Sequence, residues 1–209
     1  YLPTYELKGL EGVVYEVFAA ENIGVPGKVY HKAGEKVCEL TTGSDGMASS
    51  EPLYLGKYLV KEKSTNHGFV LDTTEYEVTL SYEDQHTAIV TQTLAKENQR
   101  QKAAVELQKN AEYFDPNTGA IYTDYGEGFV FGLYTKEAVG TIPANALLDI
   151  LTTGKDGKAV SGADLPLAEL YLKELAAPHG GYALSSKIYA VDVTSKNETD
   201  EVIVDDTHA

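Results

Sequence analysis

The feature that most constrains this chain is an internal duplication. Three segments occur twice in the same order: Gly12–Phe18 and Gly128–Tyr134, Leu40–Ala48 and Leu151–Ala159, and Tyr58–Glu62 and Leu170–Glu174. Ordered matches at similar spacing indicate a duplicated domain. We therefore predict two domains, residues 1–101 and 102–209, which meet in the polar stretch 96–102.

The residue composition predicts a β-rich fold for both domains. The chain has 15 tyrosines, no tryptophan and 19 glycines, and Val, Thr and Tyr recur at alternate positions. Short alternating segments separated by turn signals such as Asp45-Gly46 are typical of a β-sandwich. The expected strands of the first domain are 10–20, 36–42, 53–62, 75–80 and 88–98.

Two segments allow a more specific expectation. Gly24, Pro26, Gly27 and Gly34 predict an irregular loop over 22–34. Residues 99–110 could form a helix, but Val105, Leu107 and Lys109 alternate, which favours a strand that opens the second domain.

Charge and cysteine content exclude several classes of function. The chain has 17 Lys and Arg against 32 Asp and Glu, a formal net charge of -15, which argues against a nucleic-acid partner. A single cysteine, Cys38, rules out a disulfide within the chain. No apolar run approaches the length of a membrane span, so we expect none in this fragment. The five histidines lack metal-site spacing, and the 115–119 loop lacks the full calcium pattern, so we expect no metal and no cofactor.

Each copy of the third repeat ends in a glutamate that points toward the core. Side chains alternate along a strand, so Glu62 shares a face with Tyr58 and Val60, and Glu174 shares one with Leu170 and Leu172. A buried carboxylate must be protonated, paired or hydrogen-bonded. The sequence therefore predicts two buried, partnered glutamates; the alternative is that both strands are flipped and the carboxylates are exposed.

These motifs resemble tandem Cna protein B-type domains, also called SpaA-like or prealbumin-like domains, of Gram-positive surface pilins and adhesins. The resemblance rests on Gly-Val-Val-Tyr-Glu-Val, on Leu-Thr-Thr-Gly-x-Asp-Gly-x-Ala, and above all on residues 170–182 with their Ala-Pro-His-Gly-Gly-Tyr ending. Residues 64–69 of the first copy lack the proline. The resemblance covers nearly the whole chain and implies two tandem all-β, Ig-like or prealbumin-like sandwiches in an elongated arrangement.

The same resemblance implies a structural or adhesive role rather than an enzymatic one. It places the protein outside the cell, anchored to the cell wall through parts outside this fragment, with neighbouring modules of the same surface protein as partners. It also implies an internal isopeptide bond between a lysine on the first strand and an asparagine or aspartate on the last. This single-turnover reaction needs a neutral amine, which a dry core favours, and a glutamate that moves protons.

Transferred to this sequence, the pattern gives an unequal result. In the second domain Lys109 is the donor and Glu174 the promoting carboxylate, while the acceptor is Asp205, Asp206 or a residue beyond Ala209. In the first domain Glu62 is the promoter and Asn98 the acceptor. A donor is missing there, because Lys8 lies only four residues before Gly12.

Each assignment has a plainer alternative. Lys109 could be a solvated linker residue, Asn98 a turn residue, and Asp206 a surface charge. A second function is also open, in which loops 22–34 and 113–127 bind a host matrix protein or a glycan. The latter loop carries Tyr113, Tyr122 and Tyr125, and aromatic loop residues are common binding anchors.

Overall fold

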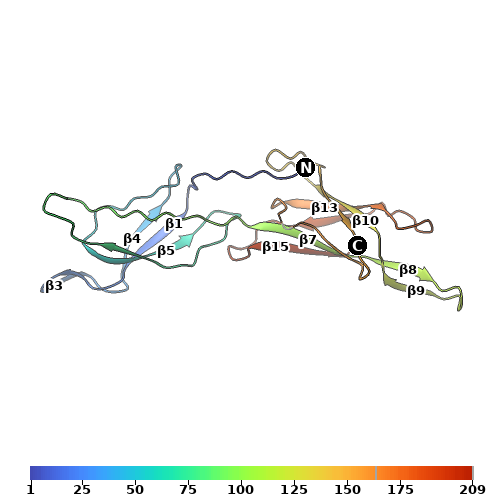
Figure 1. Ribbon diagram of the computed structural model, residues 1–209, viewed down its shortest axis with the longest axis horizontal. Helices are drawn as coiled ribbons and strands as arrows, with labels where there is room; N and C mark the ends of the chain where they lie inside the picture. The colour runs from blue at the N-terminus through green and yellow to red at the C-terminus, as the bar shows by residue number, and fades with distance from the viewer. Residues whose placement is uncertain (163, 209) are drawn as a thin grey trace. The chain divides into compact units, whose positions relative to one another are not determined.

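The computed structural model describes residues 1–162 and 164–208, which form strands and loops with no helix among them. The chain divides into two compact units. The first unit is Glu6–Arg100, and the second unit is Gln101–Ala209 together with Tyr1–Tyr5 (Figure 1). The all-β fold class is therefore confirmed.

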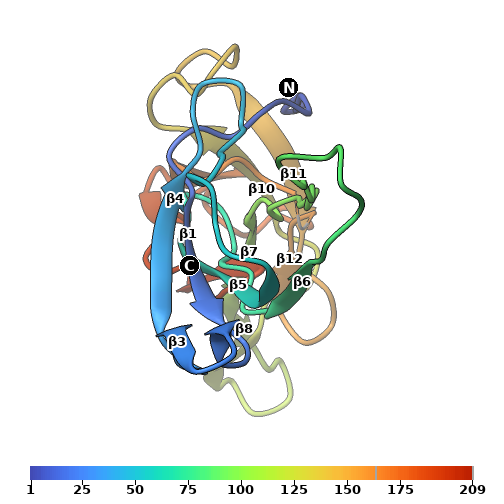
Figure 2. The same ribbon diagram turned by 90° about the vertical axis from the view of Figure 1, so that its left-hand side faces the viewer.

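The first unit contains one four-stranded antiparallel sheet in the order β4-β1-β5-β6 (Figure 2). Its strands are β1 (Val14–Ala19), β4 (Lys36–Thr41), β5 (Gly56–Ser64) and β6 (Tyr76–Leu80). A separate hairpin joins β2 (Ile23–Val25) to β3 (Lys28–His31), so the prediction of an irregular loop over 22–34 was wrong.

One expected strand of the first unit is not formed. Residues 88–99 adopt no strand, and Arg100 makes only an isolated bridge to Phe69. The sequence alternates there, but a strand exists only when a neighbour accepts its hydrogen bonds. No described segment of the first unit lies alongside residues 88–97 as a paired strand.

The second unit contains two sheets. The larger has the order β11-β10-β13-β14 and the smaller β12-β7-β15. Their strands are β10 (Val130–Thr135), β11 (Leu147–Thr152), β13 (Glu169–Ala176), β14 (Ile188–Asp192), β7 (Lys102–Gln108), β12 (Lys158–Val160) and β15 (Val202–His208). A hairpin of β8 (Asn110–Phe114) and β9 (Ile121–Tyr125) follows β7. The strand interpretation of residues 99–110 is confirmed and the helical one is wrong.

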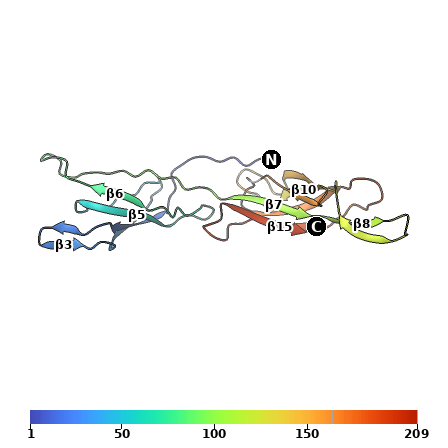
Figure 3. The same cartoon turned by 60° about the horizontal axis from the view of Figure 1, so that its bottom comes forward.

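The smaller sheet joins the first and last strands of the second unit. Strand β15 pairs with β7 in parallel, with Val202 level with Lys102 and His208 level with Gln108 (Figure 3). Strand β12 pairs with the other edge of β7 in the antiparallel direction. Strand β7 is thus the central strand of this sheet, and its inward residues Ala103, Val105 and Leu107 are fully buried.

The two units differ sharply in the size of their cores. Eighteen buried apolar residues form one cluster in the second unit, whereas four form the corresponding cluster in the first unit: Val17, Ala19, Ile23 and Tyr58. Apolar residues of the unpaired segment of the first unit stay exposed, with Ile89 at 69% and Leu94 at 39%. The smaller core follows from the absence of a second sheet in the described first unit.

The repeated Asp-Gly turns have the same local structure in both units. Gly46 and Gly157 adopt positive φ angles of 76° and 72°, which favour glycine. In the second unit the turn leads from β11 in one sheet to β12 in the other. It is therefore a crossing between the two sheets of the second unit.

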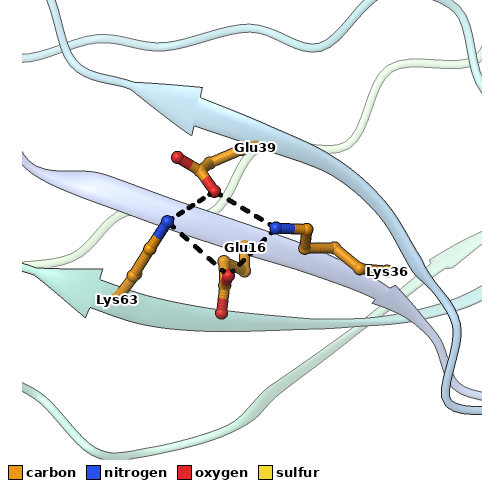
Figure 4. A network of polar contacts seen from close by, with 4 residues as sticks. All are labelled: Glu16, Lys36, Glu39 and Lys63. Atoms are coloured by element: carbon orange, nitrogen blue, oxygen red, sulfur yellow. Dashed lines mark hydrogen bonds and ion pairs between the residues drawn. The ribbon is translucent and has the colours of Figure 1, made fainter.

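The outer face of the sheet in the first unit carries a network of ion pairs (Figure 4). Lys36 Nζ lies 3.4 Å from both Glu16 Oε1 and Glu39 Oε2, and Lys63 Nζ lies 2.9 Å from Glu39 Oε2. These side chains are partly or largely exposed, so the network contributes little to stability and serves solubility.

Within residues 1–162 and 164–208, no helix is long and apolar enough to span a membrane. The same part of the chain contains no cluster of three or more His, Cys, Asp or Glu side chains with the geometry of a metal site.

Candidate functional site

The candidate site of the second unit lies where β7 ends beside the last part of β13. Lys109 Nζ lies 3.2 Å from Glu174 Oε2, and the two side chains are 14% and 1% exposed. Glu174 Oε1 accepts a hydrogen bond of 3.4 Å from the Ser185 backbone N–H. The structure therefore brings together the predicted donor and the predicted promoting carboxylate inside the core.

The position of Lys109 is fixed by the backbone on both sides. Its N–H donates to the Gly157 carbonyl at 2.8 Å, and its carbonyl accepts from the Gly126 N–H at 2.9 Å. A Cβ at Gly126 would come within 2.8 Å of Lys109 Cγ, so a glycine is needed for the lysine stem to enter the core. The ammonium also lies 4.9 Å from the centre of the Phe129 ring, in cation–π geometry.

The Ala-Pro-His-Gly-Gly-Tyr segment covers this end of the second unit. The Tyr182 ring meets the Phe129 ring edge-on with centroids 5.2 Å apart, and its hydroxyl donates to the Glu112 carbonyl at 3.1 Å. Pro178 lies so close to Gly128 that a Cβ there would be 2.9 Å from the proline. The most specific motif of the resemblance thus packs against Phe129, the ring that also lies beneath the Lys109 ammonium.

The structure does not bring Asp206 to Lys109. The parallel register places Asp206 level with Glu106, whose side chain points outward to Lys158 at 2.9 Å. Lys109 comes three residues later and on the other face, a separation of about 10 Å along the strand. Asp205 is engaged elsewhere, because its Oδ2 accepts the Asp192 N–H at 2.7 Å.

The first unit contains the same glutamate with the other half of the predicted set. Glu62 is 7% exposed, and its Oε1 accepts hydrogen bonds from Asn98 Nδ2 at 2.7 Å and from the Asp72 N–H at 3.3 Å. Its Oε2 has no hydrogen-bond partner among the described residues. Asn98 is thus a partner of Glu62 rather than the free turn residue of the plainer alternative.

No lysine stands at the donor position of the described first unit. In the second unit the Thr153 hydroxyl donates to the Gly126 carbonyl at 2.6 Å, and in the first unit Thr42 donates to the Leu10 carbonyl at the same distance. The backbone of Gly157 lies against the backbone of Lys109, and in the first unit the backbone of the equivalent Gly46 lies against that of Gly9. Gly9 therefore occupies the place of Lys109, while the neighbouring Lys8 is exposed.

The first unit also contains a buried cation, which the sequence did not predict. Lys96 has a side chain only 6% exposed, and its Nζ lies 3.0 Å from Asp72 Oδ2 and 3.8 Å from the centre of the Tyr76 ring. The available signal was its spacing: Lys96 precedes Asn98 by two residues, which places both side chains on one face of an extended segment.

Two pKa shifts, those of Tyr15 and Asp72, reflect the polar surroundings of Glu62 and Lys96 in the interior of the first unit. Burial, together with the nearby charge of Glu62, raises the pKa of Tyr15 to about 12. Burial opposes ionisation of Asp72, but hydrogen bonds from Thr74, Lys96 and Tyr76 outweigh it and hold the pKa of that carboxyl well below its usual range. Asp72 is therefore an anion paired with Lys96 at neutral pH.

Comparison with known proteins identifies the family. The model of the SpaA family, a prealbumin-like fold domain, matches residues 5–96 and 124–208. These matches cover most of the chain, which therefore belongs to this family and consists of tandem SpaA-like domains.

One solved structure agrees with this assignment at the level of the fold. The TIE protein of Bacillus anthracis is 21% identical with a TM-score of 0.60, over 96% of this chain and 31% of that protein. The chain thus spans about a third of the length of the TIE protein. The minor pilin GBS52 of Streptococcus agalactiae is 17% identical over 99% of this chain and 87% of that one, with a TM-score of 0.32. The shaft pilin SpaA of Lactobacillus rhamnosus GG is 14% identical over 94% and 88%, with a TM-score of 0.34. No curated protein sequence matches the chain.

Proposed function

We propose that this protein is a structural module of a bacterial surface protein, a pilin or adhesin stalk, whose second unit is closed by an isopeptide bond from Lys109. The observation that carries the proposal is the contact of Lys109 Nζ with Glu174 Oε2 at 3.2 Å inside the core. A covalent bond between the first and last strands would carry tension along the stalk. It would also replace disulfides, since Cys38 is the only cysteine.

The family membership and the similarity in fold to pilins of Gram-positive bacteria support this role. They also support a location outside the cell, with neighbouring modules as partners and with anchorage to the cell wall through other parts of the protein. Bond formation would occur once per molecule and involve no external substrate, so the proposed protein is not an enzyme.

The reaction proposed for the second unit needs an acceptor level with Lys109. Glu174 would take a proton from the amine and deliver one to the leaving group, and the fixed contact supplies proximity. Because His208 is level with Gln108, we assign the acceptor to a position after His208 rather than to Asp206. Its leaving group would be ammonia if the acceptor is an asparagine and water if it is an aspartate.

Intact mass spectrometry tests the proposal. The chain is extended past residue 209 by a short Gly/Ser segment and carries Ala209→Asn, so that an amide side chain follows His208 in the sequence. We expect a deficit of one ammonia, with Lys109 joined to residue 209 in the tandem spectrum. Adding Glu174→Ala or Lys109→Arg should restore the full mass. A full mass in the folded Ala209→Asn protein would contradict the proposal.

A second candidate function is ligand binding through the β8–β9 hairpin. This hairpin projects from the end of β7 (Figure 3) and exposes Phe114 at 65%, Ile121 at 72%, Tyr122 at 49% and Tyr125 at 54%. Aromatic and aliphatic side chains gathered on a projecting hairpin suit contact with a host matrix protein or a glycan. Binding of matrix proteins that is unchanged by the double substitution Phe114→Ser and Tyr122→Ser would remove this candidate.

A further inference from the structure

The outer face of the larger sheet in the second unit carries apolar side chains around one lysine. Four residues lie level with one another across β11, β10, β13 and β14: Ile150, Gly132, Lys173 and Ile188. Ile150 and Ile188 are 56% and 59% exposed. Lys173 is also exposed, and it has no ion-pair partner among the described residues.

The matching face of the first unit is built from ion pairs instead. The counterparts of Gly132, Ile150 and Lys173 in the repeat are Glu16, Glu39 and Lys61. Both glutamates belong to the network with Lys36 and Lys63 (Figure 4), and Lys61 lies 2.6 Å from Glu75. Charged, paired side chains suit a face that stays in water, whereas exposed apolar side chains are typical of a contact surface. The second unit therefore differs from the first in having a face that suits a partner.

Two tyrosines extend this apolar surface. Tyr134 and Tyr171 lie level on neighbouring strands, and their rings stack with centroids 5.2 Å apart. A Cβ at Gly132 would come within 2.6 Å of the Tyr134 ring, so the glycine allows this ring to lie along the sheet. We call the resulting surface the apolar sheet face: Tyr134, Ile150, Tyr171, Lys173 and Ile188.

The β8–β9 hairpin of the same unit presents a surface of opposite charge. Its strands place Phe114 opposite Ile121 and Glu112 opposite Thr123, and all four side chains are exposed. Glu112 has no ion-pair partner among the described residues. These four residues form the hairpin face, in which one carboxylate lies beside two large apolar side chains.

The opposite face of the hairpin fixes its orientation. Ala111 is part of the buried core of the second unit, and Tyr113 packs against that core. The Tyr113 ring also meets the Tyr182 ring edge-on, with centroids 6.5 Å apart. Because side chains alternate along a strand, the hairpin face is directed away from this core. A surface from outside the second unit is needed to cover it.

We propose that the hairpin face of one copy of this chain docks on the apolar sheet face of a second copy, with Glu112 of one copy beside Lys173 of the other. Each face has one unpaired charge among apolar side chains, and the two charges are opposite. Contact between two hairpin faces, or between two apolar sheet faces, would instead bring like charges together at a high cost. The proposed contact forms without the Lys109 bond and goes beyond it.

The contact joins two different surfaces, so it can repeat from copy to copy. Sedimentation velocity of the full chain over a range of concentrations tests it. Physiological ionic strength is used, because salt then screens the repulsion between copies with a net charge of -15. We expect the mean mass to rise above that of the monomer as the concentration rises.

Charge reversal then tests the pairing. Glu112→Lys or Lys173→Glu places like charges in the contact, and each should lower the association constant by about tenfold or more. The double variant should recover association, because it restores an opposite pair. An equal mixture of the two single variants should recover it too, which shows that the contact lies between molecules. The matched control is Lys61→Glu, which reverses the equivalent lysine of the first unit and should leave association unchanged.

Three results would overturn the inference. The first is a chain that stays monomeric at every concentration, including one whose monomer binds a glycan or a matrix protein through the hairpin. The second is association that neither charge reversal weakens, which would place the contact on another surface. The third is weakening by both reversals without recovery in the double variant or in the mixture, which would show that Glu112 and Lys173 do not meet.

Discussion

The two units share a local framework but differ in how completely they are built. In both, a threonine hydroxyl donates to a carbonyl shortly before the first strand of the main sheet, and a buried glutamate lies near the end of an inner strand of that sheet, Glu62 in β5 and Glu174 in β13. The second unit adds the sheet β12-β7-β15 and a large core, whereas the described first unit lacks both. Three strands, β7, β12 and β15, therefore separate a closed sandwich from an open one, and Lys109 directly follows the first of them.

The largest expected difference between the units comes from their cores. Leu172 and Val60 occupy matching positions two residues before the glutamates, but Leu172 is fully buried and Val60 only partly. Leu172→Ala should lower the free energy of unfolding of the second unit by about 2–5 kcal/mol. Val60→Ala should lower that of the first unit by roughly 1 kcal/mol.

Urea titration followed by amide NMR signals of each unit would measure both values in the full chain. Equal losses would show that the first unit has a second layer of core that the structure does not reveal.

The next largest loss of stability should be the same in both units, because it removes a threonine that makes the same hydrogen bonds in each. Thr153 accepts the Phe129 N–H at 3.0 Å and donates to the Gly126 carbonyl, and Thr42 does the same with Val13 at 2.9 Å and Leu10. A valine at either position leaves these backbone groups without a partner, at a cost of about 1–3 kcal/mol. Thr153→Val and Thr42→Val should therefore destabilise their own units equally in the same titration. A loss confined to the second unit would argue against a common framework.

A smaller change in stability should appear only at low pH and only in the first unit. The folded pKa of Asp72 lies below its value in the unfolded chain, which is about 4. The unfolded state thus binds the proton more readily, so the stabilisation is fully present above about pH 5 and is lost as pH falls below about 4. Asp72→Asn should flatten this part of the pH–stability curve of the first unit and leave the second unit unchanged. If the stability of the first unit falls at low pH as much in Asp72→Asn as in the parent protein, the Lys96–Asp72 pair is not the source of this pH dependence.

The smallest effect should come from the exposed ion-pair network. Lys63→Ala removes the 2.9 Å contact with Glu39 on the outer face of the first unit. Exposed pairs are screened by water and salt, so the unfolding midpoint at physiological salt should stay within the scatter of replicates. A clear fall in the midpoint that becomes larger at low ionic strength would show that this network holds the open sheet together.

Much of the fold followed from local patterns in the sequence. Alternation placed Glu62 and Glu174 inward, and the structure confirms both orientations, with Glu174 1% exposed. Alternation also gave β7 as a strand. The candidate pair Lys109 and Glu174 followed from the resemblance, and the structure places the two side chains in contact.

The remaining features depend on partners that alternation does not reveal. Residues 88–98 show the alternation of a strand, but a strand forms only where a neighbouring strand accepts its hydrogen bonds. Glycine and proline in residues 22–34 indicated a loop, although the segment pairs with itself as β2–β3. Lys96 was interpreted as a polar boundary residue, because only the fold shows that Asp72 and Tyr76 meet it in the interior.

We propose that the buried Glu174 holds the Lys109 amine against an acceptor that follows His208. This proposal is tested most directly by tandem mass spectrometry of the extended Ala209→Asn chain. We expect a cross-linked peptide that joins Lys109 to residue 209 with loss of one ammonia, and no such peptide when Glu174 is alanine. A linear Lys109 peptide from the folded protein that retains Glu174, or a cross-link that persists after Glu174→Ala, would contradict it.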